Sequence, residues 1–294
     1  MTSWQTVAVR GYLRATRKKR YRTHDAGLRS MASALPAAPA PDHLAGRLTT
    51  QALGAGEVVT VHPPADAVRG PGALVYLHGG AFVNGIMPQH WQLVTHLADT
   101  TGRQVHVARY PLAPVHDVGD AHAFLEGLSA RLTREGPVHV LGDSAGGNLA
   151  LLLAQAHGDD GAVAGLTLIA PWLDLSMTNP AIDAVERRDP WLTRAGMRPI
   201  AAHCAAGRAL TDPTVSPLFG DLTTMPPTLV LVGSRDITRP DCDRLVELAP
   251  STSELTLHVE PGSPHDYPLL PTPEGRRARE AITVHVLRTL LPRA

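Results

Sequence analysis

Short apolar runs alternate with amphipathic stretches along most of the chain. Runs such as 73–77 and 228–232 are almost continuously apolar and end at glycine-containing turns. Such runs are typical of strands that a parallel sheet buries on both faces. The stretches between them, 145–157 among them, have the spacing of helices. We therefore expect an α/β fold in which helices flank a mostly parallel central sheet.

The remaining expected elements follow the same alternation. Further strands are expected at 104–108, 138–141, 166–169 and 255–259, and further helices at 88–100, 118–134, after Pro240 and at 274–291. Ahead of them, the alternating runs 47–53 and 57–62 are joined by Gly54-Ala55-Gly56 and predict a β-hairpin.

Two segments interrupt this alternation and predict a helical cap. Residues 1–33 form a basic, helix-like arm, and a Pro/Ala-rich linker follows at 35–41. A proline-rich excursion with a helix-like stretch at 194–206 separates two of the expected strands. The expected division is an N-terminal arm at 1–45 that is part of the cap, a core at 46–174, a cap insertion at 175–222 and a second core segment at 223–294.

Composition narrows the class of protein. The 294 residues include 27 basic and 27 acidic side chains, so the formal net charge is zero, which argues against a general nucleic-acid binder. Two cysteines, Cys204 and Cys242, are too few for a disulfide framework or a zinc site. No apolar run approaches the roughly 18 residues of a membrane span. We expect a cytoplasmic protein of enzyme size.

The segment Gly142-Asp143-Ser144-Ala145-Gly146-Gly147 contains the pattern G-x-S-x-G between a predicted strand and a predicted helix. This is the context of a nucleophile elbow, in which a strained turn exposes the serine hydroxyl. The helix start also directs backbone N–H groups, beginning with that of Ala145, toward the place where negative charge develops. Ser144 is therefore the expected nucleophile.

A second glycine-containing loop, His78-Gly79-Gly80-Ala81-Phe82, follows the strand at 73–77. A loop at this point supplies the other oxyanion donors in such folds, and glycine lets the N–H groups approach the substrate. We expect Gly79 and Gly80 to donate together with Ala145, and His78 to position the loop.

These two motifs resemble the hormone-sensitive-lipase-like carboxylesterases of the α/β-hydrolase fold. Supporting segments are Leu112-Ala113-Pro114, Pro171-Trp172-Leu173-Asp174 and Ser216-Pro217-Leu218-Phe219. The resemblance covers roughly residues 50–290, and within that family the chain is similar to bacterial small-molecule esterases and acetyl-hydrolases. It implies a capped α/β-hydrolase fold, no metal or other cofactor, and small acyl esters as substrates. Ala81 stands where the family often has a third glycine, and Arg109, Pro111 and Val115 replace its usual Asp, Arg and Glu.

The acid and the base of such an enzyme follow the serine in the order Ser, Asp, His. Asp236 comes just after the strand at 228–232, at the family's position for the acid. Asp241 and Asp243 are alternatives, but they fall in the next predicted helix and are expected to face solvent. His265 lies in a turn before the last helix, where the family carries its base.

The sequence therefore predicts a serine carboxylesterase or acetyl-hydrolase that cleaves short-chain esters. The aromatic residues expected to line its pocket are Phe82, Trp91, Trp172 and Trp191. The cluster His116, Asp117, Asp120 and His122 has the spacing of a solvated helix start, so we expect no metal there.

Several alternatives stay open. An amide deacetylase or a lactonase needs the same triad, and a non-catalytic receptor can share the fold. The arm holds eight Lys or Arg between Arg10 and Arg29 with Asp25 as its only acid, a pattern compatible with an anionic membrane or nucleic acid as well as with a solvated cap helix. A homodimer is also compatible with the sequence.

Overall fold

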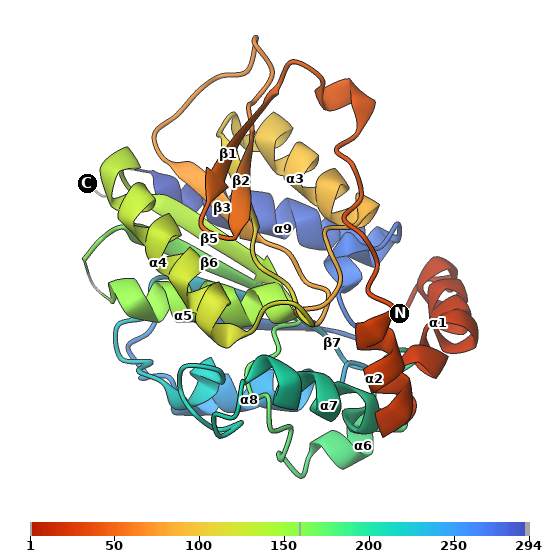
Figure 1. Cartoon of the computed structure of the whole chain (residues 1–294). Helices are drawn as coiled ribbons and strands as arrows, with labels where there is room; N and C mark the ends of the chain where they lie inside the picture. Colours follow the sequence, from red (N-terminus) through yellow and green to blue (C-terminus); the bar gives the residue numbers. More distant parts are fainter. Residues whose placement is uncertain (1, 159, 292–294) are drawn as a thin grey trace.

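The computed structural model describes residues 2–158 and 160–291. Within them, an eight-stranded sheet has the order β1-β2-β4-β3-β5-β6-β7-β8 (Figure 1). Its strands are β1 (Leu48–Leu53), β2 (Gly56–Val61), β3 (Ala73–Leu77), β4 (Val105–Arg109), β5 (Val138–Asp143), β6 (Val163–Ile169), β7 (Thr228–Gly233) and β8 (Leu255–Glu260). From β4 to β8 all neighbours are parallel, whereas β1 and β2 form an antiparallel hairpin on β4. The predicted α/β fold with a mostly parallel sheet is confirmed.

Helices cover both faces of the sheet. The helices α3 (Pro88–Thr101) and α9 (Pro273–Leu290) pack against each other on one face, and α4 (Val118–Glu135) and α5 (Ala145–His157) pack on the other (Figure 1). The helix α8 (Arg239–Leu248) packs on β7 and β8. Every residue of β7 is buried, which explains its nearly continuous apolar sequence. Within the described ranges, no helix is long and apolar enough to cross a membrane.

Helices from two distant segments gather beyond the carboxyl ends of the strands (Figure 1). They are α1 (Trp4–Thr16) and α2 (His24–Ala32) from the arm, and α6 (Ile182–Glu186) and α7 (Arg194–Cys204) from the later segment. The helix α2 lies so close to α7 that a Cβ atom on Gly27 would be 2.1 Å from the carbonyl oxygen of Gly196. Buried apolar side chains of this layer, such as Met31 and Ile200, form a cluster apart from the main core.

The arm, which the sequence predicts only as helix-like, contains two helices. After α1 the chain makes a 3-10 turn at Lys18–Arg20, and α2 starts anew at Thr23, whose hydroxyl accepts a hydrogen bond from Ala26 N–H at 3.2 Å. Such N-caps satisfy an otherwise free donor of the first helical turn. Further 3-10 turns are found at Asp42–Leu44, Pro217–Phe219 and Tyr267–Leu269. The single-turn helix α6 was also not expected.

Side chains of the arm bind distant parts of the fold. The carboxylate of Glu274, at the start of α9, accepts hydrogen bonds from Ser3 N–H at 2.6 Å, Ser3 Oγ at 2.7 Å and Thr6 Oγ1 at 2.8 Å. Lys18 Nζ donates to the carbonyl oxygen of Asp189 at 2.5 Å, and Arg10 donates to the carbonyl oxygen of Gly262 at 2.9 Å. The arm is therefore fixed to both the later cap segment and the core.

Candidate active site

Ser144 occupies the sharp turn between β5 and α5. Its backbone has φ 51° and ψ −116°, a conformation that costs a residue with a side chain about 1–3 kcal/mol. The turn is held because Ser144 N–H donates to the carbonyl oxygen of Ile169 at 2.8 Å. A Cβ atom on Gly146 would lie 2.0 Å from the carbonyl oxygen of Leu77, so glycine is required for this approach of helix to strand.

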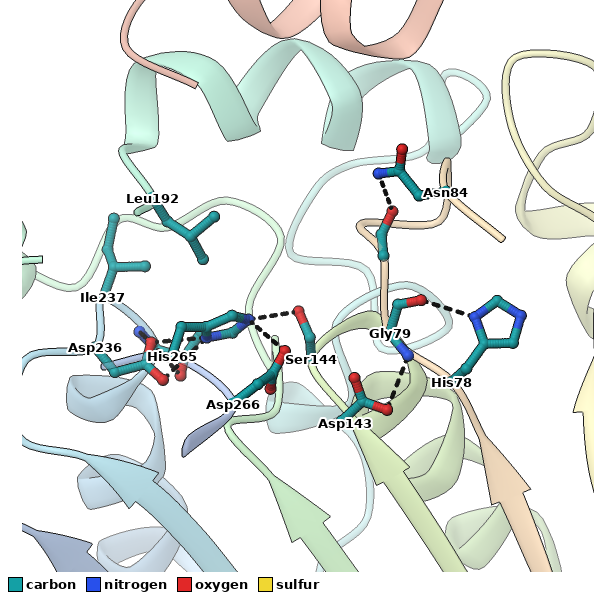
Figure 2. A network of polar contacts seen from close by, with 12 residues as sticks. His78, Gly79, Asn84, Asp143, Ser144, Leu192, Asp236, Ile237, His265 and Asp266 are labelled. Carbon is teal, nitrogen blue, oxygen red and sulfur yellow. Dashed lines mark hydrogen bonds and ion pairs between the residues drawn. The ribbon is translucent and has the colours of Figure 1, made fainter. Parts of the chain in front are cut away.

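The structure brings the three residues predicted for catalysis together (Figure 2). Ser144 Oγ lies 2.9 Å from His265 Nε2. On the other side of the ring, His265 Nδ1 lies 2.9 Å from Asp236 Oδ2 and 3.0 Å from Oδ1. Because a carboxylate only accepts, the Nδ1 proton donates to Asp236 and leaves Nε2 free to accept the serine proton. All three side chains are buried.

The carboxylate of Asp236 has further support from its own loop. Its Oδ1 accepts hydrogen bonds from Thr238 N–H at 2.9 Å and Thr238 Oγ1 at 3.0 Å. The alternative acid Asp241 was expected to face solvent, but it is buried. Its carboxylate accepts a hydrogen bond from Asn179 Nδ2 at 2.9 Å. Asp243 pairs with Arg239 on the same helix at 3.4 Å. Neither alternative contacts His265.

A third carboxyl group lies beside the imidazole. Asp266 Oδ2 is 3.3 Å from His265 Nε2, on the side of the ring that also faces Ser144 (Figure 2). Burial lowers the pKa of His265, but the charges of Asp236 and then Asp266 outweigh it and raise that pKa to about 10. Burial in turn raises the pKa of Asp266 well above its ordinary value. Asp266 belongs to none of the motifs recognised in the sequence.

In the oxyanion loop after β3, one of the expected N–H donors, that of Gly79, is already occupied. Gly79 N–H donates to Asp143 Oδ1 at 2.9 Å, so it is already used inside the loop (Figure 2). By contrast, the N–H groups of Gly80 and Ala81 have no acceptor in the part of the chain that the structure describes. Both residues line the cavity above Ser144, whereas Gly79 does not. The available donors are therefore Gly80, Ala81 and, at the start of α5, Ala145.

A buried polar network fixes this loop. Asp143 Oδ1 also accepts a hydrogen bond from Tyr76 Oη at 2.5 Å, and His90 Nε2 lies 3.4 Å from Asp143 Oδ2. His78 lies within this loop: its Nδ1 donates to the carbonyl oxygen of Gly79 at 2.7 Å, and its ring stacks on Tyr110 at 4.7 Å. Burial lowers the pKa of His78 to about 4, so its ring is neutral near pH 7.

A cavity of about 320 Å³ lies above Ser144 and His265. Of the four predicted aromatic residues, Trp191 lines it and meets the His265 ring edge-on at 5.6 Å. Phe82 and Trp172 do not line this cavity; they pack against each other, with ring centres 5.9 Å apart. Trp91 is a core residue instead, because α3 directs it into the interior, where its indole N–H donates to the carbonyl oxygen of Ala38 at 3.1 Å.

Comparison with known proteins identifies the family. A family model for the α/β-hydrolase fold matches residues 74–269. The chain belongs to the α/β-hydrolase fold family. It is 35% identical over 241 residues to an acetyl-hydrolase of Streptomyces hygroscopicus, which covers 76% of this chain and 80% of that protein. It is 36% identical over 183 residues to an esterase of Acinetobacter venetianus, and this match spans only 60% of either protein.

Solved structures of this α/β-hydrolase family extend the similarity over nearly the whole chain. An esterase from the bacterial hormone-sensitive lipase family superposes with a TM-score of 0.76 at 26% identity and covers 99% of both chains. The esterase EstE5 superposes with a TM-score of 0.83 at 23% identity over 99% of this chain and 100% of its own, which shows the shared fold. The predicted resemblance to hormone-sensitive-lipase-like carboxylesterases is confirmed, and the chain is a hydrolase of carboxylic esters.

Proposed function

We propose that this hydrolase removes short acyl groups, acetyl foremost, from small-molecule esters with Ser144, His265 and Asp236 as its catalytic triad. The observation that carries the proposal is the continuous hydrogen-bonded chain from Ser144 Oγ through the imidazole to Asp236, with 2.9 Å at each contact. Its serine end opens into the cavity, where a substrate carbonyl has access to it.

In the first half of the reaction, His265 Nε2 takes the hydroxyl proton as Ser144 Oγ attacks the ester carbonyl carbon. Asp236 holds the ring in the required tautomer and stabilises the imidazolium that forms. The tetrahedral intermediate then collapses, the ester C–O bond breaks, and the same proton passes from Nε2 to the departing alcohol. The acyl group remains on Ser144.

The negative oxygen of the intermediate needs donors that are fixed before the reaction starts. The N–H groups of Gly80, Ala81 and Ala145 suit this role, because they face the cavity or begin a helix and are not used elsewhere in the loop. Loss of one such donor typically costs about 2.7–4 kcal/mol of transition-state stabilisation. In the second half, His265 takes a proton from water, whose oxygen attacks the acyl carbon. The bond between that carbon and Ser144 Oγ then breaks, the proton passes from His265 Nε2 to Ser144 Oγ, and the free acid leaves.

The preference for short acyl chains is supported by the roof over the cavity. Side chains from α1 and from the segment before α7, such as Leu13 and Trp191, line it together with core residues. The name of the Streptomyces relative, an acetyl-hydrolase, points in the same direction. A cavity of about 320 Å³ limits the length of chain that it can bury, so a long acyl chain has to extend beyond it and lose apolar contact.

The test is hydrolysis of p-nitrophenyl esters from acetyl to palmitoyl by the wild type and by Ser144→Ala. We expect the highest kcat/KM at short chains and a loss of about 10⁶-fold in kcat in the variant. A matched control is Ser129→Ala, which changes a serine of α4 that is hydrogen-bonded to His157 at 2.7 Å, away from the cavity. Full activity in Ser144→Ala, or a preference for palmitoyl esters, would contradict the proposal.

We also propose that the protein forms a homodimer and that it is located in the cytoplasm. Light scattering of the purified protein tests the first, and fractionation of the producing cells tests the second.

A further inference from the structure

We propose that the natural ester carries a carboxylate at the end remote from the scissile bond, and that Arg17 and Arg20 bind it. This inference rests on the proposed function, because it names a feature of the substrate that Ser144 attacks. It also assigns a function to the basic side chains of the arm, which take no part in the proposed catalytic steps.

One cavity is shared by the reacting serine and two arginines of the arm. Its lining includes Ser144 and His265 as well as Arg17 and Arg20. Its volume of about 320 Å³ admits more than an acetyl group, so it has room for a second part of the substrate. An ester bound with its carbonyl carbon at Ser144 therefore lies in the same cavity as the two guanidinium groups.

The two guanidinium groups have no internal counter-ion among the described residues. The Arg20 side chain is held by neutral acceptors, with Ser30 Oγ at 3.4 Å from Nε and the carbonyl oxygen of Ser33 at 3.2 Å from a terminal nitrogen. Arg47, in contrast, pairs with Asp99 at 2.6 Å. These neutral acceptors orient the Arg20 side chain but do not neutralise its charge, so Arg20 can bind an external anion.

The surroundings do not supply the missing negative charge. The only carboxyl group among the residues that line the cavity is that of Asp266, which lies 3.3 Å from His265 Nε2 and forms no ion pair with Arg17 or Arg20. Nearby, Arg10 has a lowered pKa, caused first by burial and then by the charges of Arg235 and Arg14. The two smaller causes indicate that other cations lie close to Arg10.

The rest of the cavity wall is largely apolar. Leu13, Leu269 and Pro271 are among its residues. A substrate that fits has an acyl ester at one end, an apolar or aromatic middle and a carboxylate at the other. A carboxylate suits the site because the planar guanidinium fork matches its two oxygens.

The experiment compares matched esters that differ only in charge. One pair is 4-acetoxybenzoate and its methyl ester, which place the carboxylate on the leaving group. The other pair is p-nitrophenyl hydrogen glutarate and its methyl ester, which place it on the acyl group. The measured quantity is the ratio of kcat/KM for the anionic ester to that for the neutral ester, at low salt.

We expect the wild type to favour the anion in at least one pair, and Arg17→Gln/Arg20→Gln to lower that ratio at least tenfold. The matched control is Arg22→Gln, which removes an exposed arginine of the same arm that does not line the cavity. The wild type also provides a test that needs no variant. Salt near 1 M shortens the screening length to about 3 Å, so it should reduce the ratio.

A ratio that is equal in the wild type and the double variant for both pairs, and insensitive to salt, would overturn this inference alone. A folded wild type that hydrolyses none of the four esters would instead contradict the proposed function. The two failures are thus distinguishable.

Discussion

The carboxylate of Asp189 accepts a hydrogen bond at 2.8 Å from the main-chain N–H of Ile237, the residue that follows Asp236. Its other oxygen accepts the N–H groups of Trp191 at 2.7 Å and Leu192 at 2.9 Å. One buried side chain thereby joins the roof of the cavity to the loop that carries the proposed triad acid. Burial, and then the charge of Asp236, raise the pKa of Asp189 to about 6.

Replacing Asp189 with alanine should lower both stability and kcat. The change leaves the N–H groups of Ile237, Trp191 and Leu192 without an acceptor, and each buried unsatisfied group costs about 1–3 kcal/mol. We expect a Tm several degrees lower and a kcat reduced at least tenfold. Thermal unfolding and p-nitrophenyl acetate kinetics measure these effects. Asp183→Ala, on the exposed side of α6, is the control, and an equal loss there would refute the special role of Asp189.

The pH profile should be shifted to the alkaline side. His265 must be neutral to act as base, and its pKa is raised to about 10, so kcat/KM should keep rising above pH 7 instead of levelling there. Asp266→Asn removes one of the charges that raise this pKa, so the rise should move to lower pH. A midpoint near 6.5 in the wild type, or the same midpoint in both proteins, would show that the neighbouring carboxyl groups do not set it.

Asp143 should be needed for the oxyanion loop although it does not touch the proposed reacting atoms. In Asp143→Ala the hydroxyl of Tyr76 and the N–H of Gly79 both lose their acceptor, so the loop is no longer held in register with the elbow. We expect kcat to fall by 10- to 100-fold, in the range of one lost oxyanion donor or less, with a smaller change in KM. A variant in which KM alone changes would assign Asp143 to substrate binding.

Glu274 should control the docking of the arm. Burial raises its pKa, but hydrogen bonds from Ser3 and Thr6 dominate and lower it to about 2. The docking contribution is therefore complete above the ordinary value near 4.5 and is lost as the pH falls toward 2. Glu274→Ala should expose the arm to trypsin and reduce kcat/KM at pH 7, because α1 supplies part of the cavity wall.

Limited proteolysis followed by mass spectrometry measures this release. Glu280→Ala changes an exposed glutamate of the same helix and should leave the arm protected. Equal protection in Glu274→Ala would mean that other contacts of the arm suffice.

The order of strands and helices was predictable because it depends on local pattern. Continuous apolar runs predict the buried strands. The glycines around Ser144 predict the elbow, because the close approach of helix and strand requires them. The positions of Asp236 and His265 followed from chain order and from the family resemblance. Each of these signals lies within a few residues of the feature that it predicts.

Features that depend on distant partners could not be predicted in this way. Which N–H groups remain free in the oxyanion loop is decided by Asp143, 64 residues away from Gly79. Trp91 looked like a pocket residue because nothing near it in the sequence shows that the linker carbonyl of Ala38 takes its indole N–H. Asp189 has no motif at all, since its role arises only where the cap meets the loop after β7.

The contact between Thr6 and Glu274 joins residues that are 268 positions apart. A ribosome makes α1 long before Glu274, the residue that anchors it, which comes 268 codons after Thr6. During synthesis the helix that closes the cavity thus has no docking partner, even when the sheet up to β7 is already formed. The newly made enzyme should acquire its full pocket, and with it any selectivity, only after the start of α9 has been made.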